Sequence, residues 1–143
     1  MTANASSSSA GRPDVSVVIP VCNEEENVLP LAQEIHAALQ GRYSFETVFV
    51  DDGSTDATAK SVLAAKAQGM PEIRLIRHSV RSGQSAAVAT GVRESRATLV
   101  ATLDGDGQND PADIPNLIDA MRAGGPRLRL VMGNRVNRKD TWR

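Results

Sequence analysis

Residues 98–108 read Thr-Leu-Val-Ala-Thr-Leu-Asp-Gly-Asp-Gly-Gln, a short apolar run that passes directly into an acidic, glycine-rich cluster. The same succession occurs earlier in the chain, where apolar runs lead into the acidic clusters 23–26 and 51–56. Short apolar runs separated by helical segments indicate buried parallel strands, and open α/β sheets bind ligands outside the carboxyl ends of their strands. We therefore expect the carboxylates to converge at one edge of a sheet, where a divalent metal carrying a polyphosphate would offset their repulsion.

The periodicity of apolar residues predicts the rest of the fold. Strands are expected at 15–20, 46–50, 72–77, 98–103 and 128–133. Helices are expected at 25–39, at 56–68, from 83 or 84 to 95, and from 111 to the glycines at 124–125. This alternation predicts an α/β fold with a mostly parallel, Rossmann-like sheet and helices on both faces. The pattern ends without a closing helix, so we expect a truncated domain over 14–143 that lacks its C-terminal part. A disordered tail rich in Ser and Ala is expected at 1–13.

The composition argues against several classes of protein. A net charge of −1 and an aromatic content of 3% disfavour a nucleic-acid-binding surface. No stretch approaches the roughly 20 apolar residues of a transmembrane helix, and the N-terminal tail lacks the apolar segment of a secretory signal. Cys22 is the only cysteine, which excludes a disulfide within the chain and fits a reducing compartment. Its acidic neighbours should raise its pKa, so we do not expect a nucleophile there.

Asp104 and Asp106 are the strongest candidates for metal ligands. In extended backbone, side chains two residues apart point the same way, so both carboxylates can reach one ion. At about 5 Å apart they repel by roughly 3 kcal/mol at an effective dielectric constant of 20, a cost that a divalent cation removes. Gln108 adds a neutral oxygen at the next alternate position. An Asp-x-Asp pair after an apolar strand is also typical of phosphohydrolases that use an aspartyl nucleophile, and a metal-dependent phosphohydrolase therefore stays open as an alternative.

Polar clusters follow the other predicted strands. A carboxylate of the Asp51–Asp52 pair can accept a hydrogen bond from the imide N–H of uracil or from the N1/N2 edge of guanine. The basic, glycine-containing segment 77–85 opens a helix and can approach phosphate oxygens, although we expect His78 to be an ordinary polar residue at a strand end. Arg135, after the last strand, can hold a phosphate through two hydrogen bonds.

Together these clusters resemble the family 2 inverting glycosyltransferases of GT-A fold, and among them the dolichol-phosphate mannosyltransferase-like branch that uses polyprenyl phosphates. The resemblance rests on Pro-Val-Cys-Asn-Glu-Glu-Glu-Asn at 20–27, Val-Asp-Asp-Gly-Ser-Thr-Asp at 50–56, Ser-Gly-Gln-Ser-Ala-Ala at 82–87, Leu-Asp-Gly-Asp-Gly-Gln-Asn-Asp-Pro at 103–111, and the tail 135–142. It implies nucleotide contacts from Pro20, Val21, Asn23, Glu25, Asp52, Gly83 and Asp104. It also implies that Asp104 and Asp106 hold the catalytic metal with help from Gln108, and that Arg135 meets the diphosphate or the acceptor phosphate.

The resemblance further implies a reaction and its partners. The donor would be a nucleotide sugar such as GDP-mannose or a UDP-sugar, the cofactor Mg²⁺ or Mn²⁺, and the acceptor a polyprenyl phosphate at a membrane surface, with inversion at the anomeric carbon. A phosphate acceptor is already an anion at neutral pH, which agrees with the lack of an evident Asp/His base pair in the sequence. The protein would be cytoplasmic and peripheral at the inner face of the membrane, and no residue pattern indicates an oligomeric state. A catalytically incomplete nucleotide-binding fragment is the second alternative.

Overall fold

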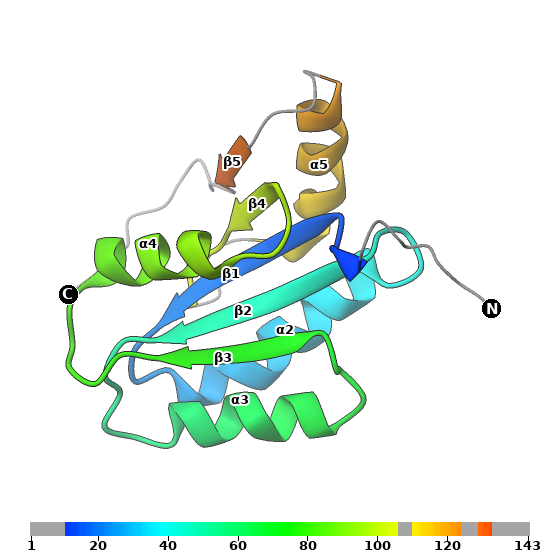
Figure 1. The fold of residues 1–143 in the computed structure, drawn as a ribbon. Coiled ribbons are helices and arrows are strands. Elements are labelled where there is room, and N and C mark those ends of the chain that lie inside the picture. Colours follow the sequence, from blue (N-terminus) through cyan, green and yellow to red (C-terminus); the bar gives the residue numbers. More distant parts are fainter. Residues whose placement is uncertain (1–10, 106–109, 124–128, 133–143) are drawn as a thin grey trace.

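The centre of the protein is a parallel β-sheet with the strand order β3-β2-β1-β4-β5 (Figure 1). The computed structural model describes residues 11–105, 110–123 and 129–132. Within them the strands are β1 (Val15–Val21), β2 (Phe45–Asp51), β3 (Ile73–Arg77), β4 (Leu99–Thr102) and β5 (Arg129–Met132). The helices are α2 (Glu25–Leu39), α3 (Thr58–Ala67), α4 (Gln84–Glu94) and α5 (Ile114–Arg122), with the short 3-10 helix η2 (Pro111–Asp113) before α5. Every strand pair is parallel, which confirms the predicted sheet.

The element boundaries follow the sequence pattern with small differences. Helix α2 has the predicted limits, whereas α3 begins two residues later than predicted, since Asp56 stays outside the helix and its Oδ1 accepts from the Thr58 amide at 2.9 Å. Asp110 caps the last helical segment through the amide of Ala112 at 3.0 Å, and the first turn after it is 3-10 and not α. The predicted ends of the last strand and most of the predicted N-terminal tail lie outside the described residues.

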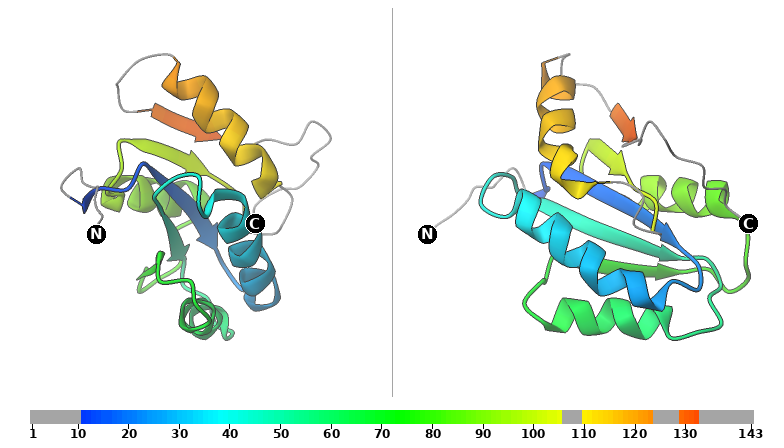
Figure 2. Two further views of the ribbon diagram at one scale, coloured as in Figure 1. Left: turned by 90° about the vertical axis from the view of Figure 1, so that its right-hand side faces the viewer. Right: turned by 180° about the vertical axis from the view of Figure 1, so that it is seen from behind.

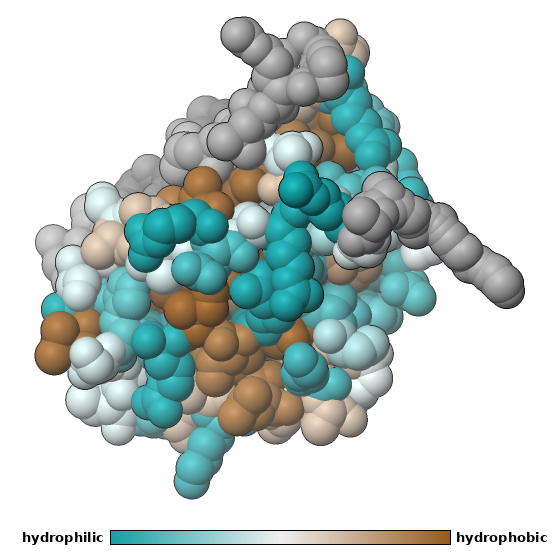
Figure 3. All heavy atoms as spheres, viewed as in Figure 1, coloured by the Kyte–Doolittle hydropathy of each residue, from teal (hydrophilic) through white to brown (hydrophobic). Residues whose placement is uncertain are grey.

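Alternate residues of β1 face opposite sides of the sheet and build two cores. Val15, Val17, Ile19 and Val21 belong to the larger core, which includes side chains of α2, α3 and α5, while Val18 belongs to a smaller core that includes Ala87 of α4. Figure 2 shows the three helices on one side of the sheet and α4 on the other. Helices on both faces were predicted, and this is confirmed. Viewed from the α4 side, the surface still carries apolar groups among polar ones (Figure 3), as expected where one helix covers a face.

None of the helices in the described part of the chain is both long and apolar enough to cross a membrane.

The strand register brings the predicted site loops to one edge of the sheet. Val21 pairs with Asp51, and Asp51 pairs with Arg77, so β1, β2 and β3 end level with one another. The amide of Asp52 donates to the carbonyl of Val21 at 2.9 Å, and the amide of Leu103 donates to that of Val18 at 3.1 Å. The acidic clusters after β1, β2 and β4 therefore leave the sheet at the same edge.

The opposite edge is held by a buried carboxylate that the sequence pattern did not mark. Glu46 is 4% exposed, and its oxygens accept from Ser16 Oγ at 2.6 Å, Arg74 Nη1 at 2.8 Å and the amide of Arg96 at 2.8 Å. Because every one of these partners donates, the buried charge is satisfied, and the network joins β1, β2, β3 and the segment before β4.

Candidate functional site

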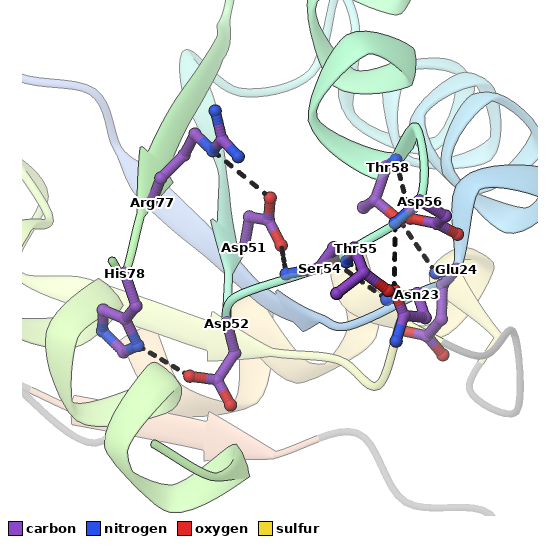
Figure 4. A network of polar contacts seen from close by, with 10 residues as sticks. All are labelled: Asn23, Glu24, Asp51, Asp52, Ser54, Thr55, Asp56, Thr58, Arg77 and His78. Carbon is purple, nitrogen blue, oxygen red and sulfur yellow. Dashed lines mark hydrogen bonds and ion pairs between the residues drawn. The ribbon is translucent and has the colours of Figure 1, made fainter. Parts of the chain in front are cut away.

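Asn23 and Glu25 join the loop after β1 to the loop after β2. Asn23 Oδ1 accepts from the amides of Thr55 at 2.8 Å and Asp56 at 3.3 Å, and the Asn23 amide donates to Ser54 Oγ at 2.8 Å (Figure 4). Glu25 accepts from the amide of Ala57 at 2.8 Å. Asn23 has a φ of 55°, a left-handed conformation that asparagine tolerates well. Both side chains thus shape the acidic edge, and their contact with a nucleotide stays a prediction.

The turn after β2 packs closely against the loop after β3. Asp51 is 1% exposed; its Oδ1 accepts from the Ser54 amide at 3.0 Å, and its Oδ2 lies 3.5 Å from Arg77 Nε. Gly53 has a φ of 74°, and a Cβ atom on it would lie only 2.7 Å from the amide nitrogen of Arg81. Glycine is therefore required there both by conformation and by the close approach of the two loops.

Asp52 holds the loop that leads into α4. It is fully buried, and Oδ1 accepts from His78 Nδ1 and from the Ser82 amide, while Oδ2 accepts from the Gly83 amide, each at 2.8 Å. Burial alone would raise the pKa of Asp52, but the hydrogen bonds from His78, Ser82 and Gly83 outweigh burial and hold its pKa below the ordinary value. Asp52 is thus an ionised anchor, and its direct contact with a nucleotide base stays a prediction.

His78 and Asp52 form an Asp/His pair, although none is evident from the sequence. Its Nδ1 pairs with Asp52, and its Nε2 lies 2.8 Å from Thr90 Oγ1 on α4. Since both ring nitrogens are engaged by the protein, the imidazole bridges the end of β2 and α4 rather than serving as an unengaged base. The expectation that His78 is a satisfied polar residue at a strand end is confirmed. The pair was missed because the two residues are 26 positions apart and meet only in the folded sheet.

Asp104 follows β4 at the same edge and contacts α4. Its Oδ1 accepts from Nε2 of Gln84, the first residue of α4, at 3.0 Å. Asp104 is half-buried. Its predicted partners Asp106 and Gln108 lie outside the described residues, as does Arg135, so their roles stay predictions.

Glu24, which sequence reasoning passed over in favour of Glu25, lies beside the Asp104 segment. A Cβ atom on the buried Gly105 would lie 2.7 Å from Glu24 Oε1, 2.7 Å from the Pro20 carbonyl oxygen and 2.6 Å from Val21 Cγ1. The absence of a side chain at Gly105 therefore lets the segment after β4 pass directly against the end of β1. The signal was present in the sequence: Glu25 and Glu26 are the first residues of α2, so only Glu24 precedes the helix and can turn toward the sheet.

The remaining predicted nucleotide contacts are placed at this edge by the backbone. Pro20 and Val21 end β1, with both side chains buried, and the Val21 side chain belongs to the larger core. Gly83 has a φ of 104° and precedes the first residue of α4. Their contact with a nucleotide stays a prediction for all three.

The donor set at this edge suits a hard divalent cation. Asp104 follows β4, and Glu24 Oε1 lies close to the next residue, Gly105; carboxylate oxygens are ligands that Mg²⁺ and Mn²⁺ prefer. Among the described residues, no group of three His, Cys, Asp or Glu side chains forms a metal site by itself. A cation here would accordingly need further oxygens from residues 106–108 or from a bound phosphate.

We predict that Cys22 reacts slowly with alkylating reagents. Burial raises the pKa of its thiol above the ordinary value; Arg81 acts against this, and Asp52, Asp51 and Glu24 add to it. The rate of iodoacetamide labelling, followed by mass spectrometry, should rise about tenfold per pH unit between pH 7 and 9, because only the thiolate reacts. A rate that levels off below pH 8 would contradict the raised pKa, and Cys22→Ser should remove all labelling.

The fold and the acidic edge together define an α/β protein whose acidic loops follow the carboxyl ends of parallel strands, where open α/β sheets bind their ligands. The chain belongs to glycosyl transferase family 2, whose family model matches residues 16–143. It is 38% identical over 128 residues to a dodecaprenyl-phosphate galacturonate synthase of Rhizobium johnstonii, a match that covers 89% of this chain and 37% of the relative. It is 41% identical over 132 residues to an undecaprenyl-phosphate 4-deoxy-4-formamido-L-arabinose transferase of Pseudomonas paraeruginosa, covering 90% of this chain and 38% of the relative.

Solved structures of GT-A glycosyltransferases share the fold. A mannosyltransferase from Pyrobaculum calidifontis, solved in complex with GDP-Man and Mn²⁺, superposes with a TM-score of 0.65 at 28% identity over 78% of this chain and 32% of the other. The glucosyl-3-phosphoglycerate synthase of M. tuberculosis superposes with a TM-score of 0.62 at 26% identity over 78% of this chain and 42% of the other. The predicted GT-A fold is thereby confirmed, and the chain spans less than half the length of these relatives.

Proposed function

We propose that this chain forms the donor-binding part of a glycosyltransferase that moves a sugar from a nucleotide-sugar donor to a polyprenyl phosphate, with inversion. The observation that carries the proposal is the convergence of Asp52, Asp104 and Glu24 at one edge of a parallel sheet in a family 2 chain. The two curated relatives named above, both polyprenyl-phosphate enzymes, support the acceptor class.

In this proposal the chain's own residues position the donor. The loops after β1 and β2 form one wall, which Asn23 and Glu25 hold together, and the first turn of α4 faces the same edge with backbone amides that suit a phosphate. Asp104 with Asp106 and Gln108 would hold Mg²⁺ or Mn²⁺. Such an ion, when bound, neutralises charge on the departing nucleoside diphosphate.

The acceptor needs no general base in this proposal. A polyprenyl phosphate is ionised at neutral pH and can attack the anomeric carbon directly. The His78–Asp52 pair is committed to holding α4, and it is not required as a base. Arg135 is proposed to meet the diphosphate or the acceptor phosphate, and the reaction is proposed to take place at the cytoplasmic face of a membrane.

The family assignment argues against a phosphohydrolase with Asp104 as nucleophile. The nucleotide-binding fragment without catalysis stays as the alternative, because the chain covers 37% and 38% of the two curated relatives. Binding and transfer therefore have to be measured separately.

We expect the chain to bind one nucleoside diphosphate, GDP or UDP, in a metal-dependent manner. Calorimetric titration with GDP, UDP, GDP-mannose and UDP-glucose, each with and without Mn²⁺, tests the donor site and identifies the base. A transfer assay with a short-chain polyprenyl phosphate then separates an active transferase from a binding fragment. The absence of binding to any of the four ligands in the presence of Mn²⁺ would contradict the proposal.

A further inference from the structure

Gln84 connects helix α4 to the Asp104 carboxylate. A carboxylate at neutral pH can only accept hydrogen bonds, so the Gln84 amide must present its nitrogen to Asp104, which fixes the orientation of the amide. The Nε2–Oδ1 distance is 3.0 Å. This contact restricts the position of the Asp104 carboxylate from the helix side, while Gly105 and the end of β1 restrict the chain that follows it.

The start of α4 is itself fixed by the buried Asp52. Ser82 and Gly83, the two residues before Gln84, donate their amides to Oδ1 and Oδ2 of Asp52 at 2.8 Å each. Gly83 has a φ of 104°, which only glycine adopts readily, and this sets the direction in which the chain enters the helix. The two residues before Gln84 are therefore held in place by their hydrogen bonds to Asp52.

Two further contacts hold α4 along its length. His78 Nε2 lies 2.8 Å from Thr90 Oγ1, which ties the middle of the helix to the Asp52 pair. Gly91 lies so close to the sheet that a Cβ atom on it would be 2.3 Å from Val18 Cγ1. The helix is thus packed tightly against β1, and the path Asp52–Gly83–Gln84–Asp104 joins the carboxylate after β2 to the carboxylate after β4.

We propose that Gln84 is a positioning residue for the divalent metal site. By donating to Oδ1, it holds the Asp104 carboxylate in the orientation in which its other oxygen is presented to the cation. Hydrogen-bond partners behind a metal ligand typically change metal affinity 10- to 100-fold. This inference rests on the proposed function, because it requires that Asp104 binds a metal.

The test is the affinity for Mn²⁺, measured by electron paramagnetic resonance with and without GDP or UDP. Gln84→Met keeps the length of the side chain and removes the donor, and it should weaken Mn²⁺ binding by about tenfold or more. Gln84→Asn keeps the amide but is one methylene shorter, so it should also weaken binding. Gln33→Met, the same replacement at an exposed position in the middle of α2, is the matched control and should leave Mn²⁺ affinity unchanged.

The thermal midpoint of each variant separates positioning from folding. A lower Mn²⁺ affinity with an unchanged thermal midpoint supports the inference. If both Gln84 variants bind Mn²⁺ as the unmodified chain does, the inference is overturned and the proposed function stands. If the unmodified chain itself binds no Mn²⁺ in the presence of either nucleotide, the metal-dependent function is overturned, and this inference with it.

Discussion

Asp104→Ala is expected to abolish the metal-dependent part of nucleotide binding. Asp104 is the described carboxylate of the predicted Asp-x-Asp pair, and it lies at the carboxyl-end edge, where Glu24 Oε1 approaches the following residue, Gly105. Removing a residue that hydrogen-bonds to a metal ligand typically lowers metal affinity 10- to 100-fold. Removing the ligand itself should therefore weaken Mn²⁺ binding by at least about 100-fold. Calorimetric titration of GDP or UDP, with and without Mn²⁺, measures the effect directly.

Asp104→Asn distinguishes charge from shape in the same experiment. Asparagine keeps the size of the side chain but removes the negative charge, so its effect on Mn²⁺ binding should approach that of alanine if the carboxylate binds a cation. Asp113→Asn removes the same charge at an exposed position of η2 and should leave binding unchanged. Unchanged metal dependence in Asp104→Ala would show that the metal lies elsewhere. Any nucleotide binding that the unmodified chain shows without metal should persist in all three variants.

The fold could be predicted from the sequence because its signals are local. The five residues that form the apolar stripe of α2 are all buried in the structure; they are Val28, Leu31, Ala32, Ile35 and Leu39. Each strand contains several apolar residues, although β2 also carries Glu46 and β3 carries Arg74. The edge at which ligands bind in such a fold follows from parallel topology alone. The placement of the acidic clusters at one edge of the sheet could therefore be predicted from the sequence.

The partners of the polar side chains could not be predicted, because they depend on contacts between distant segments. Asn23 and Glu25 bond to the loop after β2, more than 30 positions away, and Asp52 turns inward toward Ser82 and Gly83. The sequence shows which residues follow the end of a strand, but it does not show the direction in which each side chain points. The resemblance to a family assigned roles to these residues as ligand contacts, whereas the structure adds their bonds within the protein.

Asp52→Asn is expected to destabilise the protein strongly. The substitution replaces an ionised, fully buried acceptor of three hydrogen bonds by an amide whose NH₂ group would face a donor from Ser82, Gly83 or His78. Hydrogen bonds to a charged group contribute about 1.5–3 kcal/mol each, so their loss is a large part of the 5–15 kcal/mol that stabilises an ordinary domain. Urea unfolding of the unmodified chain and of Asp52→Asn at pH 7 measures the decrease in the free energy of unfolding, with both the midpoint and the denaturant slope compared.

The loss should depend on pH in a direction set by the lowered pKa of Asp52. A carboxylate whose pKa is lower in the folded protein than its ordinary value of 3.8 contributes stability above that value and loses it as the pH falls through the folded pKa. The difference in unfolding free energy between the unmodified chain and Asp52→Asn should hence be constant above about pH 5 and shrink at lower pH.

Asp113→Asn is the matched control for this series, since Asp113 is exposed and its replacement should change the unfolding free energy by less than about 0.5 kcal/mol. If Asp52→Asn were as stable as this control at pH 7, Asp52 would not anchor the start of α4. Asp52 would then not fix the position of Gln84 through Ser82 and Gly83, although the hydrogen bond between Gln84 and Asp104 would remain. If instead Asp52→Asn is destabilised as expected, the carboxylate is needed to hold the loop whatever it contacts on a bound nucleotide.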